Sequence, residues 1–481
     1  MTQFEENASD IYPLHLLDDV AGNHSFPAWI MRFNDVLDAD KLHESLSKLL
    51  EIGDWRKLGG RLRFKDNGKM TIHVPKKFAP EQPAITFTHV KLPESKIEDN
   101  EVARRLPKPT NGLSIQPIPN THDFTCFAAR PDFPKTIGEM IERGLPQLSL
   151  HITSFSDATL VSLAWPHTMM DAVGQQDLLR SWSLVLAGRE AEVPTVLGAR
   201  EDVLAKVDNW TSETKEKLVL DKRRLSALGV VKLMSRFLWR KYRDAPRETR
   251  VICLPKSLLK TLQSQAREEN NGEFVSDGDL ITALTIRAAT LANATPRPVT
   301  AVHLLNGRFR IPWLQKPDPE GIHLQNIVLL AYSFIQAETA ASSAGAIALA
   351  NRQQLVEQAT ESQITLFLQR LRHEFRVKGK PNLWYGEPGA RIMFFNNLLK
   401  PAFIQATDFS PAVVGQGEPA ESRTNPPGTM VNYFHLVLDK PDGGIDTCYV
   451  LGRDHAENYW IMGRFLPKTW VQLEKHLMGV V

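Results

Sequence analysis

The stretch from Leu148 to Gly188 constrains the fold of this chain more than any other part of the sequence. Residues 148–152 alternate apolar and polar side chains, residues 161–165 follow a similar pattern, and turn residues separate them, which predicts two strands. Apolar side chains then recur at helical spacing at Leu178, Leu179, Trp182, Val185 and Leu186. Gly188 stands where such a helix would stop. The pattern therefore places residues 167–171 between a buried strand and a helix, where α/β sheets carry reactive groups.

His167 is the residue at this junction whose side chain can act as an acid or a base. The reference pKa of an imidazole lies near neutrality, so a neutral His167 can take a proton from an alcohol or an amine. Pro166 fixes the backbone just before it. Asp171 is expected to shape the turn and to pair with a distant arginine rather than with the imidazole. The alternative is that His167 is a packed or surface residue, which is the commoner role of a lone histidine beside a strand.

Other kinds of site find less support in the sequence. Only His151 lies near His167 as a second imidazole, and Asp171 and Asp177 are the nearby carboxylates, a set that does not favour a metal site. No G-x-S-x-G elbow of a serine hydrolase occurs. The cysteines, Cys126, Cys253 and Cys448, are odd in number and far apart, which argues against a disulfide framework and against metal-ligand spacing.

Length and charge narrow the class of protein. A chain of 481 residues is too long for one ordinary core, so we expect at least two domains. The formal net charge is +2, and the densest basic stretch, 236–250, is interleaved with aromatic residues. That stretch indicates an amphipathic segment or linker rather than a nucleic-acid groove.

The acidic segment 1–6 lacks a signal-peptide core, and the longest apolar run, 327–335, is too short to span a bilayer. We expect a reduced, soluble, cytoplasmic monomer.

The remaining segments predict two α/β halves of similar size joined by a crossover. We expect an N-terminal domain over 1–195, a charged and helical crossover over 196–248 with its helix at 200–242, and a C-terminal domain over 249–481. Strands are predicted at 28–33, 70–74, 250–255, 299–305, 327–336, 391–397, 430–438 and 447–451. Helices are predicted at 38–50, 256–268, 280–291, 339–358, 363–374 and 470–477, with Ser276 and Asp279 as a capping box and a hairpin turn at 66–68.

The pentapeptide His167-Thr168-Met169-Met170-Asp171 resembles the H-x-x-x-D-G signature of the BAHD acyltransferases, which use acyl-CoA donors. Peptide-synthetase condensation domains carry a similar signature with two histidines. Further segments look like elements of the family. Residues 12–18 look like its opening strand, residues 55–62 like its "LAGRL" stretch, and residues 274–287 like its helix that starts with Ser or Thr. Residues 306–308 occupy the place of its D-x-R element, and residues 408–412 occupy the place of its D-F-G-W-G motif. The overall look is closer to the fungal branch, which includes trichothecene acetyltransferases, than to the plant branch.

Several positions depart from the family pattern. Ala172 replaces the glycine after the aspartate, and Asn306 replaces the aspartate of D-x-R. Ser410 and Pro411 replace Gly-Trp in the C-terminal motif. The family's Thr-Ser-Trp element corresponds to the residues from Asn396 or Asn397 onward, where no tryptophan is present.

The resemblance implies an α/β, chloramphenicol-acetyltransferase-like fold, with two similar-sized domains whose mixed sheets are flanked by helices and joined by a long crossover. It implies direct transfer of an acyl group, such as acetyl, from a CoA thioester to a hydroxyl of a small secondary metabolite, bound between the halves. His167 would be the general base, and Asp171 would pair with Arg308 to support its loop. The amide of Asn396 or Asn397 would meet the oxyanion. Asp408 and Phe409 would belong to the degenerate C-terminal motif.

The same resemblance implies acyl-CoA as co-substrate, with no bound cofactor. From the residues we expect no metal, no nucleic acid and no membrane span. Three other readings stay open. The acyl donor can be a thioester on a carrier protein, as in the condensation domains. The chain can be a degenerate, non-catalytic module that binds a hydrophobic metabolite or a partner. It can also run another reaction on the same ligand.

Overall fold

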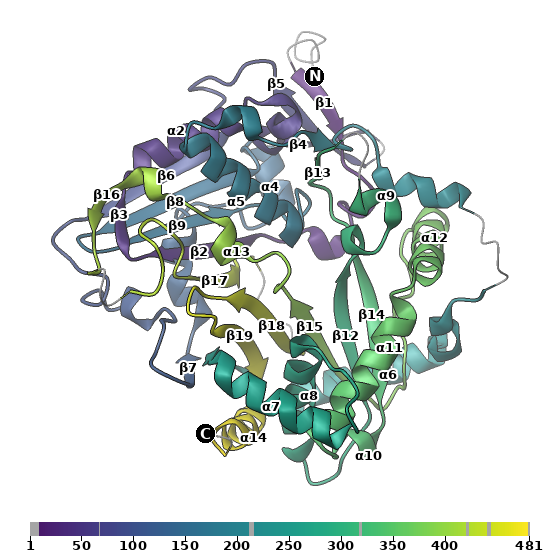
Figure 1. Cartoon of the computed structure of the whole chain (residues 1–481). Coiled ribbons are helices and arrows are strands. Elements are labelled where there is room, and N and C mark those ends of the chain that lie inside the picture. The colour runs from purple at the N-terminus through teal and green to yellow at the C-terminus, as the bar shows by residue number, and fades with distance from the viewer. Residues whose placement is uncertain are drawn as a thin grey trace.

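The computed structural model describes residues 9–66, 68–210, 216–316, 320–419, 423–439 and 444–479. The structure contains two mixed sheets, one toward the upper left of Figure 1 and one toward the lower right, each with helices against it. In spatial order the first comprises β17 (Asn432–Val437), β2 (Pro27–Phe33), β9 (Thr159–Ala164), β8 (Leu148–Phe155) and β6 (Ile85–Leu92). The second comprises β14 (Val328–Ile335), β12 (Val299–Asn306), β15 (Arg391–Asn397), β18 (Asp446–Arg453), β19 (Tyr459–Phe465), β11 (Glu248–Leu254) and β7 (Ser114–Ile118). The predicted mixed α/β class is confirmed.

The unit predicted from the opening stretch is present. β8 and β9 pair antiparallel, and their residues are almost all buried. Helix α5 (Ala172–Leu186) follows, and its N-cap is Asp171, whose side chain accepts hydrogen bonds from the first-turn amides. Gly188 lies just beyond the helix with φ +74°, a conformation that favours glycine. His167 therefore lies between the end of β9 and the start of α5, as expected.

The sheets do not follow the order of the chain. β17, from the C-terminal part, pairs with β2, and β7, from the N-terminal part, pairs with β11. Two small pairings also join distant segments: β16 (Val413–Gln416) with β3 (Asp35–Leu37), and β10 (Val196–Leu197) with β13 (Ile322–His323). The domain boundaries at 195 and 249 stay a prediction, and each large sheet contains a strand from across them.

The second sheet is covered by helices that the sequence largely predicted. α7 (Lys256–Glu269), α8 (Asp277–Leu291), α11 (Ala344–Gln358) and α14 (Pro467–Met478) share a core with it. The predicted capping box is present, because the Ser276 hydroxyl accepts from the Asp279 amide while the Asp279 carboxylate accepts from the Ser276 amide. In the N-terminal part, α2 (Ala39–Leu49) begins after its cap Asp38, and β1 (Ser9–Pro13), β5 (Met70–Pro75) and β4 (Arg61–Phe64) form a small sheet.

The crossover was predicted wrongly in detail. Instead of one helix over 200–242, the described part has short 3-10 helices at Val203–Asn209 and Val219–Arg223 and one α-helix, α6 (Ala227–Arg243). The helix predicted at 339–358 is broken into α10 (Ala337–Ala340) and α11, because the Ser343 hydroxyl caps a new helix. The helix predicted at 363–374 is α12 (Glu361–Lys378). The sequence did not predict β19 or assign β6 and β7.

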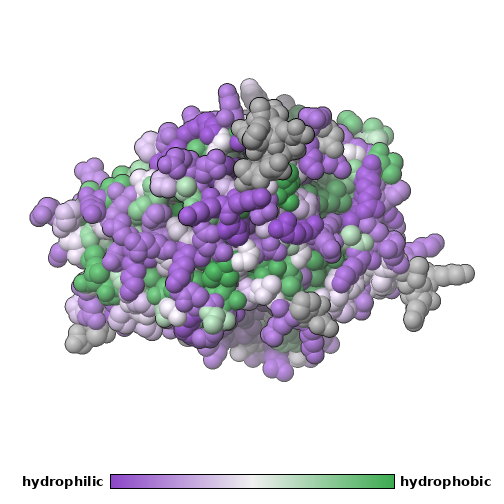
Figure 2. Space-filling view, turned by 90° about the horizontal axis from the view of Figure 1, so that it is seen from above, coloured by the Kyte–Doolittle hydropathy of each residue, from purple (hydrophilic) through white to green (hydrophobic). Residues whose placement is uncertain are grey.

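The described fold also contains short α-helices: α3 (Thr125–Ala128), α4 (Ile137–Glu142), α9 (Pro312–Gln315) and α13 (Phe403–Ala406). The acidic segment 1–6 and Asn67 of the hairpin turn lie outside the described residues. Figure 2 shows the molecule from above, where hydrophilic side chains dominate and hydrophobic areas between them are small. Among the described helices, none combines the length and the apolar character that a bilayer crossing would need.

Candidate active site

A cavity of about 1740 Å³ is lined by strands of both large sheets. Trp29 of β2 and His435 of β17 contribute from the first sheet, and residues of β12, β14, β15 and β18 contribute from the second. A pocket for one drug-sized ligand usually occupies roughly 300–1,000 Å³, so this cavity has room for more than one small molecule. His167 lies on its wall.

The backbone of His167 is fixed from two sides. Its amide donates to the Ser25 carbonyl at 2.8 Å, and its carbonyl accepts from the Asn326 side chain at 3.0 Å. Pro166 and Met169 close a tight turn around it through a backbone hydrogen bond of 2.9 Å. The loop that carries the imidazole is therefore held by hydrogen bonds on both sides of His167.

The imidazole of His167 is enclosed by protein but partly accessible from the cavity. Its Nδ1 atom is buried, and no other described residue offers it a hydrogen bond. Burial is the main cause that lowers the pKa of His167 below its usual value, because an apolar environment disfavours the charged form. The group is therefore neutral at neutral pH, which is the form that accepts a proton.

Both carboxylate oxygens of Asp171 are engaged by groups other than His167. One oxygen accepts from the amides of Val173 and Gly174 at 3.0 and 3.1 Å, and the other accepts from Arg308 at 2.6 Å and from the Ile327 amide at 2.9 Å. The side chains of Asp171 and Arg308 are only 1% and 8% exposed. The expected ion pair is thus present and buried, and it joins the start of α5 to the segment before β14.

Arg308 holds that segment by further contacts. Its guanidinium donates to the carbonyls of His323 and Gln325 at 2.7 and 2.6 Å. Its own amide donates to the side chain of Asn306 at 2.9 Å, and Asn306 is the N-cap of the 3-10 turn Gly307–Phe309. Asparagine caps a helix about as well as aspartate does. The departure at Asn306 therefore leaves the local geometry of Arg308 intact.

The departure at Ala172 has a similar explanation. Ala172 is the first residue of α5, where a side chain is tolerated. The close approach occurs at Gly174, where a Cβ atom would lie 2.9 Å from both the Leu324 carbonyl oxygen and the Met170 side chain. The position that cannot carry a side chain without a shift is therefore Gly174 rather than the residue after Asp171.

A second buried contact behind His167 was not predicted. Asp18 accepts from the backbone amide and from the side-chain amide of Asn326, at 2.7 and 2.9 Å. Burial is the main cause that raises the pKa of Asp18. Because Asn326 also donates to His167, Asp18 helps to position the histidine loop. No local pattern in the sequence signals a contact between residues so far apart.

His435 is a cavity histidine that the sequence reasoning also missed. Burial, with a smaller contribution from His167, lowers the pKa of His435 to about 4, and both histidines line the same cavity. The ring of His435 packs edge-on against Tyr449, with centroids 5.4 Å apart. A signal was available, because His435 lies in the correctly predicted strand 430–438. His303 of β12 lines the same cavity, and burial lowers its pKa to about 4.

Asn396 and Asn397, the oxyanion candidates, both line the cavity at the end of β15. Asn396 is in register with Tyr449 of β18 and is half-buried. Asn397 is exposed, and its side-chain oxygen accepts from the Leu399 amide at 3.0 Å, so it shapes a turn. The structure thus brings Asn396 toward the His435–Tyr449 pair and gives Asn397 a local contact.

Asp408 and Phe409, of the degenerate motif, lie outside the cavity lining. Phe409 is fully buried and packs on Trp182 of α5 and on Phe33 of β2, with centroids 4.5 and 5.3 Å apart. The Asp408 carboxylate accepts from the Ser410 amide at 2.9 Å. Both residues therefore anchor a loop, a structural contact that does not reach His167.

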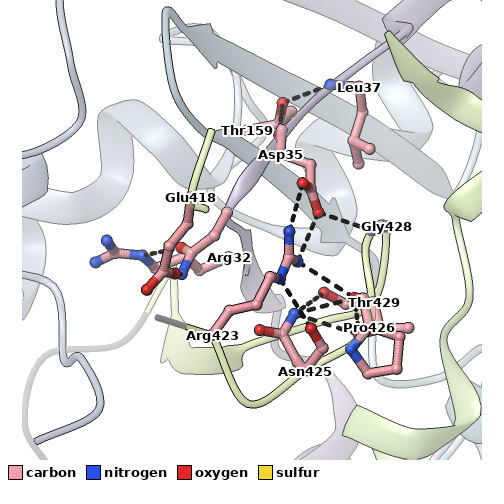
Figure 3. A network of polar contacts seen from close by, with 11 residues as sticks. Arg32, Asp35, Leu37, Thr159, Glu418, Arg423, Asn425, Pro426, Gly428 and Thr429 are labelled. Atoms are coloured by element: carbon pink, nitrogen blue, oxygen red, sulfur yellow. Dashed lines mark hydrogen bonds and ion pairs between the residues drawn. The ribbon is translucent and has the colours of Figure 1, made fainter. Parts of the chain in front are cut away.

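A buried ion pair holds the continuation of that loop, as Figure 3 shows. Asp35 accepts from both terminal nitrogens of Arg423, at 2.7 and 2.8 Å, and from the Gly428 amide at 2.7 Å. Asp35 lies on β3, whose neighbour Thr159 begins β9. The loop after Phe409 is thereby tied to the first sheet despite the changed residues of the motif.

Within the described ranges, no group of three or more histidine, cysteine, aspartate or glutamate side chains is placed to hold a metal ion. Groups at the cavity wall, among them His167, His435 and Asn396, can accept protons or form hydrogen bonds.

Comparison with known proteins gives consistent results. Residues 134–367 match the family model described as the Transferase family. The O-acetyltransferase PaAT-2 of Phomopsis amygdali is 34% identical and aligns over 99% of both chains. The acetyltransferase BOT5 of Botryotinia fuckeliana is 33% identical over 97% of this chain and 90% of its own. Among solved structures, F. sporotrichioides TRI101 complexed with coenzyme A and T-2 has the same fold, with a TM-score of 0.65, 14% identity and 97% of each chain covered.

Proposed function

This chain belongs to the BAHD family of acyltransferases, and we propose that it transfers an acetyl group from acetyl-CoA to a hydroxyl of a small apolar metabolite. The observation that carries the proposal is the neutral His167 on the wall of a cavity large enough for donor and acceptor together. The names of the relatives PaAT-2 and BOT5 support acetyl as the acyl group.

The proposed reaction is direct transfer. The neutral imidazole of His167 takes the proton of the acceptor hydroxyl while the hydroxyl oxygen attacks the thioester carbonyl. The tetrahedral intermediate collapses, the carbon–sulfur bond breaks, and the leaving thiolate receives the proton from His167. The products are the ester and free CoA, and the enzyme returns to its starting state.

The oxyanion of the intermediate needs a donor placed in advance, and losing one such donor typically costs about 3 kcal/mol. We assign this role to the amide of Asn396, because it lines the cavity beside Tyr449, which contacts His435. Asn397 is the weaker choice, since its side-chain oxygen is already used in a turn.

Cationic side chains of the same cavity support a CoA donor. Arg310, Lys380 and Lys400 all line it, and CoA carries phosphates that such groups bind. Apolar side chains, among them Trp29, Leu330 and Phe394, line other parts of the cavity and suit an apolar acceptor. Asp171 and Arg308 would act as positioning residues, because both are engaged with backbone groups of the loops around His167.

The test is turnover of acetyl-CoA with a set of hydroxylated metabolites, followed by release of free thiol and by mass spectrometry of the ester. His167→Ala should abolish transfer and leave the melting temperature close to that of the wild type. His151→Ala is the matched control, because it removes a buried imidazole from β8 outside the cavity lining.

Normal turnover by His167→Ala would refute the general-base role. Binding of acetyl-CoA without thiol release for any acceptor would favour a binding module. Transfer that requires an acyl group loaded on a carrier protein would replace CoA as the donor.

A further inference from the structure

Helix α6 presents an apolar stripe to solvent. Five large apolar side chains on it are 62–88% exposed: Leu228, Val231, Leu238, Trp239 and Tyr242. Their spacing in the sequence puts them on one face of the helix, about 100° wide. Trp239 and Tyr242 lie side by side, with ring centroids 6.5 Å apart. We call this face the α6 stripe.

The stripe is distinct from the face by which α6 packs on the rest of the protein. α6 has a separate inward face, on which Gly229 and Leu233 are buried and Phe237 is half-buried. The hydroxyl of Ser226 caps its first turn. The helix is therefore held by one apolar face while the other is left uncovered by any part of the chain that the structure describes.

Positive charge flanks the stripe. α6 contains Lys232, Arg236, Arg240, Lys241 and Arg243 and no acidic residue. On the helical wheel Lys232, Arg236 and Arg243 fall on one side of the stripe and Lys241 on the other. A helix with an apolar face, interfacial aromatic residues and flanking lysine and arginine is the pattern that binds the surface of anionic membranes.

A small cavity lies behind the helix, on the side of Arg236. It has a volume of about 230 Å³, and Arg236, Arg240, Arg297 and Thr290 are among its lining residues. Within the described residues, none of these three guanidinium groups has an ion pair. Thr290 is 4% exposed, and its hydroxyl has no hydrogen-bond partner there. An anion in this cavity would supply partners for all four groups.

The two carboxylates of the same lining are already engaged. Asp446 pairs with Arg247 at 2.9 Å and with Arg391 at 2.5 Å, and Asp244 pairs with Arg243 at 3.1 Å. Among the described residues, neither carboxylate forms an ion pair with Arg236, Arg240 or Arg297. A lipid phosphate of a bilayer that covers the stripe would lie next to this cavity, because Arg236 and Arg243 belong to both surfaces.

We propose that α6 docks this protein on an anionic membrane surface, with the stripe in the interfacial layer and a lipid phosphate at the cavity behind it. α6 contributes no residue to the described lining of the large cavity, so docking leaves the proposed catalytic site free. A second copy of the chain is a poorer occupant of the stripe, because two such faces would bring their flanking cations together.

Sedimentation of the full chain with lipid vesicles tests the proposal. The wild type should bind phosphatidylcholine vesicles that contain phosphatidylserine, bind pure phosphatidylcholine weakly, and be released by high salt. The double variant Trp239→Ser/Tyr242→Ser should bind the anionic vesicles about tenfold more weakly or worse. Arg236→Gln/Arg240→Gln should lose most of the preference for anionic lipid. The matched control Phe64→Ser/Val471→Ser changes side chains that are 53% and 59% exposed elsewhere and should bind as the wild type does.

Three results would overturn the proposal. The first is equal binding by the wild type and by Trp239→Ser/Tyr242→Ser. The second is a concentration-dependent dimer that the same variant abolishes, which would assign the stripe to a second copy. The third is stabilisation by inorganic phosphate without any vesicle binding, which would make the cavity a site for a soluble anion. Acyl transfer to a water-soluble acceptor should be unchanged in the stripe variant and serves as the check on folding.

Discussion

Asp171→Ala removes a carboxylate that accepts four hydrogen bonds inside the protein. Its loss leaves the guanidinium of Arg308, whose side chain is 8% exposed, without its counter-ion. Breaking one side of a buried ion pair costs about 3–5 kcal/mol, and losing a helix N-cap costs about 1 kcal/mol. The sum is a large part of the roughly 5–15 kcal/mol by which a typical protein is stable.

We therefore expect Asp171→Ala to lower the apparent Tm by several degrees and to lower the yield of folded protein. Asp171→Asn keeps the volume and the capping oxygen but not the charge, so its Tm should lie between those of Asp171→Ala and the wild type. The assay is differential scanning fluorimetry of both variants, combined with kcat/KM per folded molecule.

Asp35→Ala is the matched control. Asp35 is completely buried and pairs with two nitrogens of Arg423, whereas Asp171 pairs with one nitrogen of Arg308. Unlike Asp171, Asp35 lies outside the cavity lining. Its Tm should fall by a similar amount while the folded fraction keeps its turnover. A soluble Asp171→Ala protein with wild-type Tm and no turnover would contradict the positioning role and point to direct chemistry by the carboxylate.

Two further predictions concern His167 and Phe409. Burial lowers the pKa of His167, and the neutral imidazole is the base. As the pH is lowered, kcat/KM should therefore still be at its maximum at pH 6.5 and should fall only when the pH passes the lowered pKa. A fall in kcat/KM centred above pH 6.5 would refute this. Phe409→Ala removes a fully buried ring between α5 and β2 and should cost about 3–5 kcal/mol of stability, seen as a lower Tm with KM for acetyl-CoA unchanged; a raised KM at normal Tm would place the motif in the binding site.

The unit around His167 was predictable because its signals are local. Alternation marks β8, and helical spacing marks α5. Asp171 and Gly188 stand at the ends of the helix, where their chemistry suits a cap and a positive φ. The crossover gave no such signals. Its charge suggested one helix, but the segment Val203–Asn209 is a short 3-10 helix. Its Leu204 and Val207 are buried in an apolar cluster with Phe367 and Leu368 of α12.

The site was predictable only where a short motif carries it. The strand-to-helix pattern singled out His167 and Asp171, and a resemblance added Arg308. The ion pair of Asp171 and Arg308 is present. Asp18 and Asn326 meet only because the fold brings together residues about three hundred positions apart. His435 was visible as part of a strand, but its place in the same cavity as His167 depends on the pairing of β17 with β2, which no local pattern encodes.

β17 pairs with β2 and β7 pairs with β11, so each large sheet needs a strand from the other half of the chain. This has a consequence for synthesis of the protein. A ribosome that adds about 5–20 residues per second completes β2 and then needs on the order of 20–80 s before β17 is available to pair with it. During that interval the edge of β2 presents unpaired backbone groups, a template for pairing with other chains. The nascent protein is therefore most prone to aggregate before its last fifty residues emerge, and a chaperone that shields β2 during synthesis should raise the yield of native enzyme.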